Sequence, residues 1–178
     1  MYNHNPQKYI RVEGERRFLL KTFPEGFDPE ISTLRIIDHY IAGTRLRLHR
    51  MEFTSGETLI LKLGQNYHGA GQKAYQRIMT NIYMTEIEYQ TLAVLSGSSI
   101  IKRRYPYQYA GNDYSIDVFE ANLDGLILME IESLPDRDIH SLPIPGFTAR
   151  EVTDDLLFTS RNLAELSREE FQRWLSSW

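Results

Sequence analysis

The chain has 178 residues, of which 42% are hydrophobic and 25% are charged, and its formal net charge is −4. This composition is typical of a soluble globular protein, and the length is enough for a sizeable core. The slight acidity argues against a broad surface for extended nucleic acid. The absence of cysteine excludes disulfides, thiolate metal sites and cysteine nucleophiles.

No N-terminal apolar run has the pattern of a signal peptide, and no stretch approaches membrane-spanning length. We therefore expect a cytoplasmic protein without a membrane partner. We also expect one domain over residues 1–178, with a loose tail at residues 1–8 and a C-terminal helix within residues 164–178.

Strand patterns follow one another along the chain and are separated by turn signals. Strands are predicted over residues 9–20, 36–42, 45–53, 58–63, 74–83, 100–107, 114–120 and 126–133. The glycine-rich stretch 64–71 is predicted to be a loop. Most links are of hairpin length, which favours antiparallel pairing.

Helices are predicted in two regions. Thr85 and Glu88 form a capping-box pattern, and the helix that they begin is expected to end at Gly97. Its apolar stripe is expected to contain Ile87, Thr91, Leu92 and Leu95. The C-terminal part is predicted to be helical over residues 153–163 and 168–177, and Ser167 with Glu170 forms the second capping box.

Charged residues recur two positions apart in these strands, and such positions share one face of a strand. Like charges side by side are unfavourable unless they face opposite charges or a ligand. One such pair alone is more simply explained by a solvated face. Because they fall on most strands, the pairs together predict a sheet that curls closed around them. The expected fold is α+β, a closed antiparallel β-barrel of about eight strands that forms a charged tunnel, with helices packed outside.

The charged residues are of two kinds that suit one task. Carboxylates are hard oxygen ligands for Mg²⁺ or Mn²⁺, and they are Glu13, Glu15, Asp117, Glu130 and Glu132. Cations bind phosphate, and they are Arg17, Arg45, Arg47, Lys62, Arg77, Lys102 and Arg104. Carboxylates and cations around one lumen predict a site for a polyphosphate and a metal.

The run Glu13-Gly14-Glu15-Arg16-Arg17 resembles the Glu-x-Glu-x-Lys signature of the CYTH superfamily, the triphosphate tunnel metalloenzymes. The resemblance continues in order over roughly residues 9–163. It includes Arg45-Leu46-Arg47, Ile60-Leu61-Lys62, Lys102-Arg103-Arg104, Ser115-Ile116-Asp117, Glu130-Ile131-Glu132 and Arg150-Glu151-Val152-Thr153-Asp154.

This resemblance implies a barrel that binds a triphosphate and a divalent metal. It implies that Glu13, Glu15, Glu130 and Glu132 are catalytic metal ligands, with Asp117 a fifth, and that Arg45, Arg47, Lys62, Lys102 and Arg104 bind phosphate. Arg17 replaces the usual lysine. The chain departs from the family at Arg77 and Met79, at Ser115, and at Leu156 and Leu157, where charged residues are usual.

The resemblance implies a triphosphatase acting on inorganic tripolyphosphate, thiamine triphosphate or a nucleoside triphosphate. Two alternatives stay open: a non-catalytic module that binds polyphosphate or a nucleotide, and an adenylyl cyclase that makes cyclic AMP. A homodimer is also open, since Trp174 and Trp178 suit either a helix anchor or a subunit contact. The histidines show no ligand spacing and are assigned surface or packing roles, although His49 shares the parity of Arg45 and Arg47.

Overall fold

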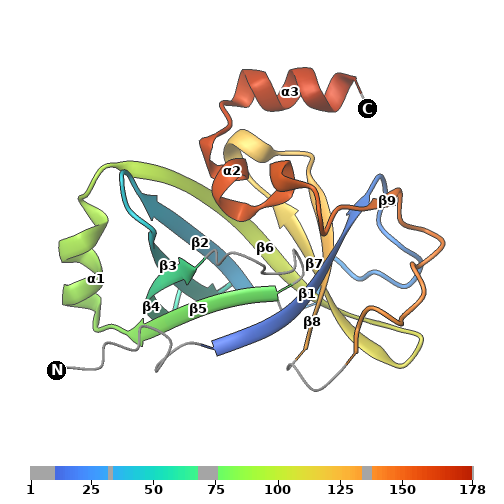
Figure 1. Ribbon diagram of the computed structural model, residues 1–178, viewed down its shortest axis with the longest axis horizontal. Helices are drawn as coiled ribbons and strands as arrows, with labels where there is room; N and C mark the ends of the chain where they lie inside the picture. The colour runs from blue at the N-terminus through green and yellow to red at the C-terminus, as the bar shows by residue number, and fades with distance from the viewer. Residues whose placement is uncertain (1–10, 32–33, 68–75, 134–137, 178) are drawn as a thin grey trace, which may run out of the picture.

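The computed structural model describes residues 11–31, 34–67, 76–133 and 138–177, so the predicted tail at residues 1–8 lies outside the described residues. All nine strands of the described residues belong to one antiparallel sheet, which forms a curved wall (Figure 1). The strands are β1 (Arg11–Leu20), β2 (Leu34–Ile41), β3 (Leu46–Phe53), β4 (Thr58–Tyr67), β5 (Gln76–Tyr83), β6 (Gly97–Tyr109), β7 (Asn112–Phe119), β8 (Ile127–Ser133) and the short β9 (Arg150–Glu151).

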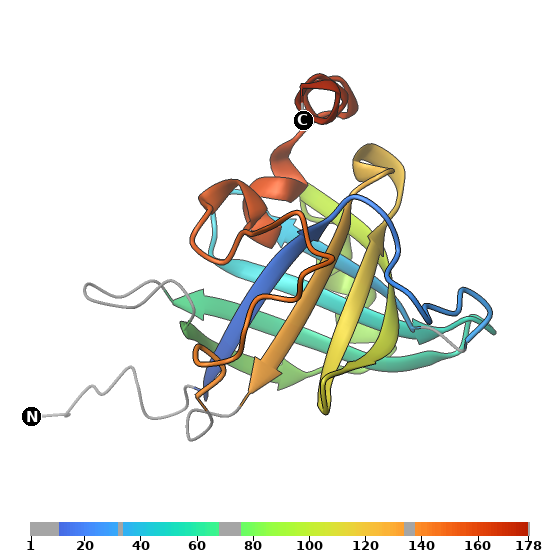
Figure 2. The ribbon, with the colours of Figure 1, turned by 90° about the vertical axis from the view of Figure 1, so that its right-hand side faces the viewer.

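The wall closes on itself because β1 pairs on both of its sides. The strand order is β5-β4-β3-β2-β6-β7-β8-β1-β9, and an additional pairing of β1 with β5 completes the ring. The N-terminal part of β1 pairs with β5, and β9 takes over the same edge at Phe18 and Leu19. Figure 2 shows the crossing strands of the closed wall. The predicted closed antiparallel barrel is confirmed.

Both predicted capping boxes begin helices. Thr85 caps α1 (Glu86–Ala93), and Ser167 caps α3 (Arg168–Ser176), each with the expected glutamate three residues on. Between β9 and α3 lie the 3₁₀-helix η2 (Leu156–Phe158) and α2 (Ser160–Glu165), and η1 (Ala121–Leu123) links β7 to β8. The helix predicted over 153–163 is therefore two short pieces, since Asp155 and Thr159 each cap a new start.

One end of the barrel is filled by apolar side chains. Leu19, Tyr40, Ile100 and Leu128 come from four strands, on the same strand faces as the charged residues, and they pack against residues of η2, α2 and α3. Figures 1 and 2 show this C-terminal segment lying over one end of the wall. The interior therefore changes along each strand from charged to apolar.

The outer faces of the strands are covered by two smaller clusters. Tyr89 of α1 packs with Leu48 and Leu61 on the outside of β3 and β4. Phe18, Ile116 and Met129 pack with Ile139 and its neighbours outside β1, β7 and β8. The apolar residues that alternate with the charged ones thus face outward, as the pattern predicted.

Three local predictions were wrong. Gly64 was expected to start a loop, but β4 continues through it to Tyr67, and residues 68–71 lie outside the described residues. A Cβ atom on Gly64 would lie 3.0 Å from Asn81 Oδ1 and 3.7 Å from Arg47 Nε, so the glycine makes room for its neighbours. Gly97 starts β6 rather than ending α1, which stops at Ala93. The predicted stripe of α1 is wrong in part: Ile87 is 78% exposed and Tyr89 is the buried residue, while Leu92 packs against the same cluster as Tyr89.

None of the helices among the described residues is both long and apolar enough to cross a membrane.

Candidate active site

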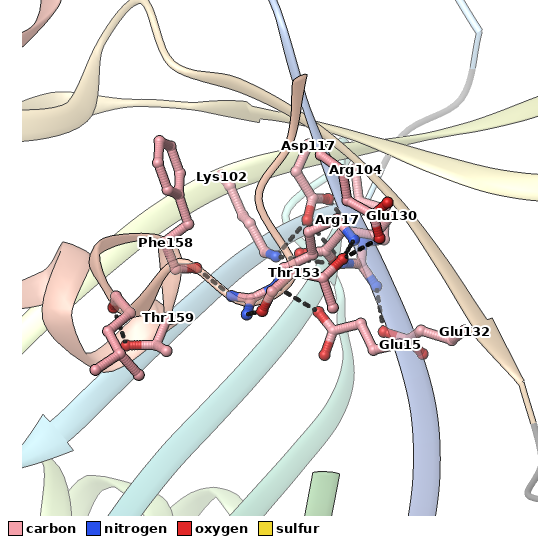
Figure 3. Close-up of polar contacts among 12 residues, drawn as sticks. Glu15, Arg17, Lys102, Arg104, Asp117, Glu130, Glu132, Thr153, Phe158 and Thr159 are labelled. Atoms are coloured by element: carbon pink, nitrogen blue, oxygen red, sulfur yellow. Dashed lines mark hydrogen bonds and ion pairs between the residues drawn. The ribbon is translucent and has the colours of Figure 1, made fainter. Parts of the chain in front are cut away.

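The register of β1 and β8 places their charged residues side by side inside the barrel. Glu15 lies opposite Glu132, and Arg17 lies opposite Glu130. On the other side of β8, Glu130 pairs with Ser115 of β7. Because side chains two positions apart share a face, these residues and Asp117 project into the same lumen. Four of the five predicted carboxylates, Glu15, Asp117, Glu130 and Glu132, are therefore gathered in one place (Figure 3).

Arg104 of β6 is the centre of this group. Its Nε lies 2.7 Å from Asp117 Oδ1 and its Nη2 lies 2.7 Å from Asp117 Oδ2. Nη2 also donates to Glu130, and Nη1 lies 3.6 Å from Glu132 Oε1 (Figure 3). Burial alone would lower the pKa of Arg104, but Asp117, Glu130 and Glu132 raise it well above its usual value. The guanidinium thus stays charged and holds three carboxylates together.

Lys102 supports the same cluster from deeper in the lumen. Its ammonium group donates to Asp117 and lies 3.9 Å from Glu130 Oε2. The side chain is buried, which by itself would lower its pKa, but the charges of Asp117 and Glu130 outweigh this and raise it. Asp117, with a side chain that is 0% exposed, therefore has two permanent cations as partners.

Arg17 is directed at the C-terminal segment. Its Nη1 donates to the carbonyl of Phe158, and its Nη2 lies 3.2 Å from the carbonyl of Thr153. Its backbone N–H donates to Thr153 Oγ1 at 3.0 Å, and its Nε lies 3.6 Å from Glu15 Oε1. In Figure 3 the guanidinium lies between the carboxylates and the loop at Phe158. This arginine ties the segment that fills the barrel end to β1.

A second charged group lies on β2 and β3, and one of its members, Asp38, was not among the predicted site residues. Asp38 of β2 is buried, and its Oδ1 lies 2.7 Å from His49 Nδ1 and 3.5 Å from Arg47 Nε. Burial would raise the pKa of Asp38, but Arg47, His49 and Lys102 together bring it far below its usual value. The effect of Lys102 links this group to the first one.

The remaining predicted site residues are Glu13, Arg45, Lys62 and Arg77. Glu13 Oε1 is 2.9 Å from Arg11 Nε. Arg45 is exposed and lies in the turn before β3, where the sequence had predicted strand. The ammonium group of Lys62 lies 5.4 Å from the ring centre of Tyr83. Arg77 is opposite Glu13 in the pairing of β1 and β5, and its side chain lies outside what the structure describes.

The mouth of the lumen lies at the ends of the strands away from the apolar cluster. A cavity of about 830 Å³ is bounded there by the start of β2 and the β6–β7 hairpin. Leu34, Arg104, Gln108, Asp113 and Ser115 are among its lining residues. Arg104 therefore belongs both to the buried cluster and to a space that a small molecule can enter.

The carboxylates of the cluster are the candidate ligands for a divalent metal. Among the described residues, no three acidic or histidine side chains are arranged to hold a metal ion. The register places Glu15 directly opposite Glu132, and these like charges are offset by Arg17, 3.6 Å from Glu15, and by Arg104, 3.6 Å from Glu132. Carboxylate oxygens are the ligands that Mg²⁺ and Mn²⁺ prefer. The donor chemistry thus suits a divalent cation, but in the described residues Glu130 and Glu132 are paired with Arg104 and would have to be released from it to bind one.

Known proteins resemble this chain in sequence and in fold. No protein-family model matches it. An inorganic triphosphatase of Nitrosomonas europaea is 27% identical over 158 residues, which cover 86% of this chain and 97% of that protein. A crystal structure of an inorganic triphosphatase aligns with a TM-score of 0.55 at 22% identity, over 85% of this chain and 93% of that chain. Another, of a protein described as hypothetical, aligns with a TM-score of 0.55 at 23% identity, over 87% of this chain and 99% of that chain. The barrel is thus a fold that has been seen before, and the sequence similarity extends over most of the chain.

Proposed function

We propose that the protein is a diverged member of the CYTH superfamily that hydrolyses a triphosphate inside the barrel, with inorganic tripolyphosphate as the first candidate substrate. The observation that carries the proposal is that a set of carboxylates and a set of cations face the same lumen from different strands. Carboxylates lie on β1, β7 and β8, and cations lie on β3, β4 and β6. The similarity to an inorganic triphosphatase over most of the chain supports the same activity.

The cation wall would bind the phosphates. A guanidinium fork matches two phosphate oxygens, so Arg104 can exchange Asp117 and Glu130 for a bound anion that enters through the mouth. Arg47 and Lys62 supply further charge from β3 and β4. Arg17, held by backbone carbonyls, would act by keeping the C-terminal segment in place.

The carboxylate wall would hold the metal. Glu13, Glu15, Glu130 and Glu132 are the proposed ligands, with Asp117 beside them. A divalent cation at this position would supply a Lewis acid that offsets the charge of the phosphate oxygens. Freed from Arg104, Glu130 and Glu132 would become available on the same face as Glu15.

The test is phosphate release by the purified protein from tripolyphosphate, thiamine triphosphate and ATP, with Mg²⁺, with Mn²⁺ and with a chelator. Glu130→Gln and Glu15→Gln should lower the rate by about 10²-fold, the scale for loss of one electrostatic group in an active site. Glu52→Gln is the matched control, because Glu52 pairs with Arg35 and Arg50 on the outer face of β3. Equal rates for all three variants would reject this site.

Binding without catalysis is the second candidate, and one observation favours it. Met79 of β5 is buried where family members carry an acid, and its sulfur accepts from the amide of Asn81 at 3.3 Å. This part of the wall therefore offers no carboxylate to a second metal. Calorimetry that detects tight tripolyphosphate binding, together with no phosphate release with either metal, would establish this function in place of hydrolysis.

A further inference from the structure

Asp38 and His49 form a buried pair in the lumen that the proposed site leaves without a role. They lie directly opposite each other on β2 and β3. Asp38 is 3% exposed and His49 is 9% exposed, and His49 Nδ1 lies 2.7 Å from Asp38 Oδ1. A carboxylate bonded to one ring nitrogen fixes the orientation and tautomer of an imidazole, and leaves the other nitrogen to act.

The other nitrogen, Nε2, is accessible. It makes no hydrogen bond with any residue that the structure describes, and it is not among the buried side-chain atoms that lack a partner. His49 shares its strand face with Arg47, which contacts the same Asp38. Nε2 is therefore available on the wall to which we assign the phosphates.

Cations surround this pair on the neighbouring strands. Arg47 lies on β3, the strand of His49, and Lys62 lies opposite His49 on β4. Lys102 of β6 is close enough to act on the charge of Asp38. Three cations near one carboxylate oppose a positive imidazole, and a bound triphosphate reverses this balance because it adds several negative charges. The imidazole therefore lies on the wall where a bound triphosphate would bring its negative charge.

We propose that His49 donates the proton that the leaving group needs in the hydrolysis of the triphosphate, with Asp38 as its positioning residue. This inference rests on the proposed function. The water oxygen forms a bond to the terminal phosphorus while the bridging P–O bond breaks, and the electron pair stays on the leaving pyrophosphate oxygen. The proton of Nε2 moves to that oxygen, the attacking water loses a proton to solvent, and the imidazole is protonated again from solvent.

The experiment follows kcat and KM for tripolyphosphate against pH in four proteins: the unchanged chain, His49→Gln, Asp38→Asn and the double variant. General acid catalysis contributes about 10²–10⁴-fold. We expect His49→Gln to lower kcat by about 10²-fold or more, with KM within about threefold, and to abolish the fall of kcat at high pH. Adding Asp38→Asn to His49→Gln should lower kcat no further, because the aspartate acts through the histidine.

Two further variants distinguish the loss of the proton donor from a loss of folded structure. His49→Asn places an amide where Nδ1 was, so it keeps a donor for Asp38 and lacks a group at Nε2; it should fold and lose kcat like His49→Gln. His39→Gln is the control, because His39 bonds to Ser99 and Leu95 outside the proposed site. NMR of the His49 ring in the unchanged protein should show its titration moving to higher pH when tripolyphosphate is added.

The outcomes are distinct. An active unchanged protein with an intact pH profile in folded His49→Gln overturns the role of His49 and leaves the proposed function standing. An unchanged protein that releases no phosphate with either metal overturns both. A ring titration that is the same with and without tripolyphosphate also overturns the proposal, even if every His49 variant fails to fold.

Discussion

Arg104 forms a bidentate ion pair with Asp117, since its Nε and Nη2 each lie 2.7 Å from a different carboxylate oxygen. The two residues lie opposite each other on β6 and β7, so the strand register itself sets this geometry. The same planar fork is suited to two phosphate oxygens. Arg104 therefore stabilises the empty lumen with the same contacts that it would offer to an anion.

Replacing Arg104 by leucine should be costly, because it leaves Asp117 with Lys102 alone and removes one partner of Glu130. Breaking one side of a buried ion pair costs about 3–5 kcal/mol of unfolding free energy. Urea unfolding measures the loss. Arg103→Leu is the neighbouring control, since Arg103 bonds to Glu120 on the exposed outer face and should cost less than about 1 kcal/mol. Similar losses in the two variants would contradict the arrangement.

Arg17→Lys tests the attachment of the C-terminal segment. Lysine keeps the charge but cannot donate to the carbonyls of Phe158 and Thr153 together. We expect a loss of about 1–3 kcal/mol in unfolding free energy, from at least one buried carbonyl left without a donor. Hydrogen exchange should quicken in residues 153–158 and in α2. If stability is unchanged and only KM for tripolyphosphate rises, Arg17 is a phosphate ligand instead.

Asp38 should make stability depend on pH in the acidic range. Its pKa in the folded protein lies below the unfolded value of about 3.9 because of Arg47, His49 and Lys102, so the unfolded chain binds the proton more readily. The stabilisation is complete above that unfolded value and is lost as the pH falls toward the folded one. Below about pH 5, unfolding free energy should therefore fall less steeply with pH in Asp38→Asn than in the unchanged protein. Parallel curves would show that Asp38 contributes nothing to acid unfolding.

Gly64→Ala tests the close approach of β3, β4 and β5 inside the barrel. The new methyl group would lie 3.0 Å from Asn81 Oδ1, so the amide must shift, and Arg47 lies next to it. We expect a loss of about 1–3 kcal/mol, the usual cost of overpacking, and weaker tripolyphosphate binding by calorimetry. Gly146→Ala is the control, because nothing lies within 4 Å of the added atom and the backbone there is unstrained. That variant should be neutral or slightly more stable.

Most of the barrel could be predicted because a strand has only two faces. The alternation of charged and apolar residues in β1, β6 and β8 set the direction of each side chain without knowledge of its neighbours. The helix starts at Thr85 and Ser167 could also be predicted, since both partners of each capping box lie within four residues.

The features that were missed depend on distant contacts. Asp38 has no charged residue two positions away, and its partners come from the register of β2 with β3. The direction of Arg17 depends on Thr153 and Phe158, which dock from more than a hundred residues away. Composition favoured a loop at Gly64, but this glycine lies within β4, where its lack of a side chain leaves space for Asn81 and Arg47. Local pattern carries none of this information.

The place of β1 in the ring also bears on how the barrel folds. β1 is the first strand of the ring in the sequence, and its longest pairing is with β8, the last strand of the ring. The hairpins of β2 to β5 and of β6 to β8 can form earlier, so closure of the ring is the slow, non-local event. Until then β5 and β8 are free sheet edges, which can pair with other chains. Pulse-labelled hydrogen exchange during refolding should find the amides of β1 among the last to be protected.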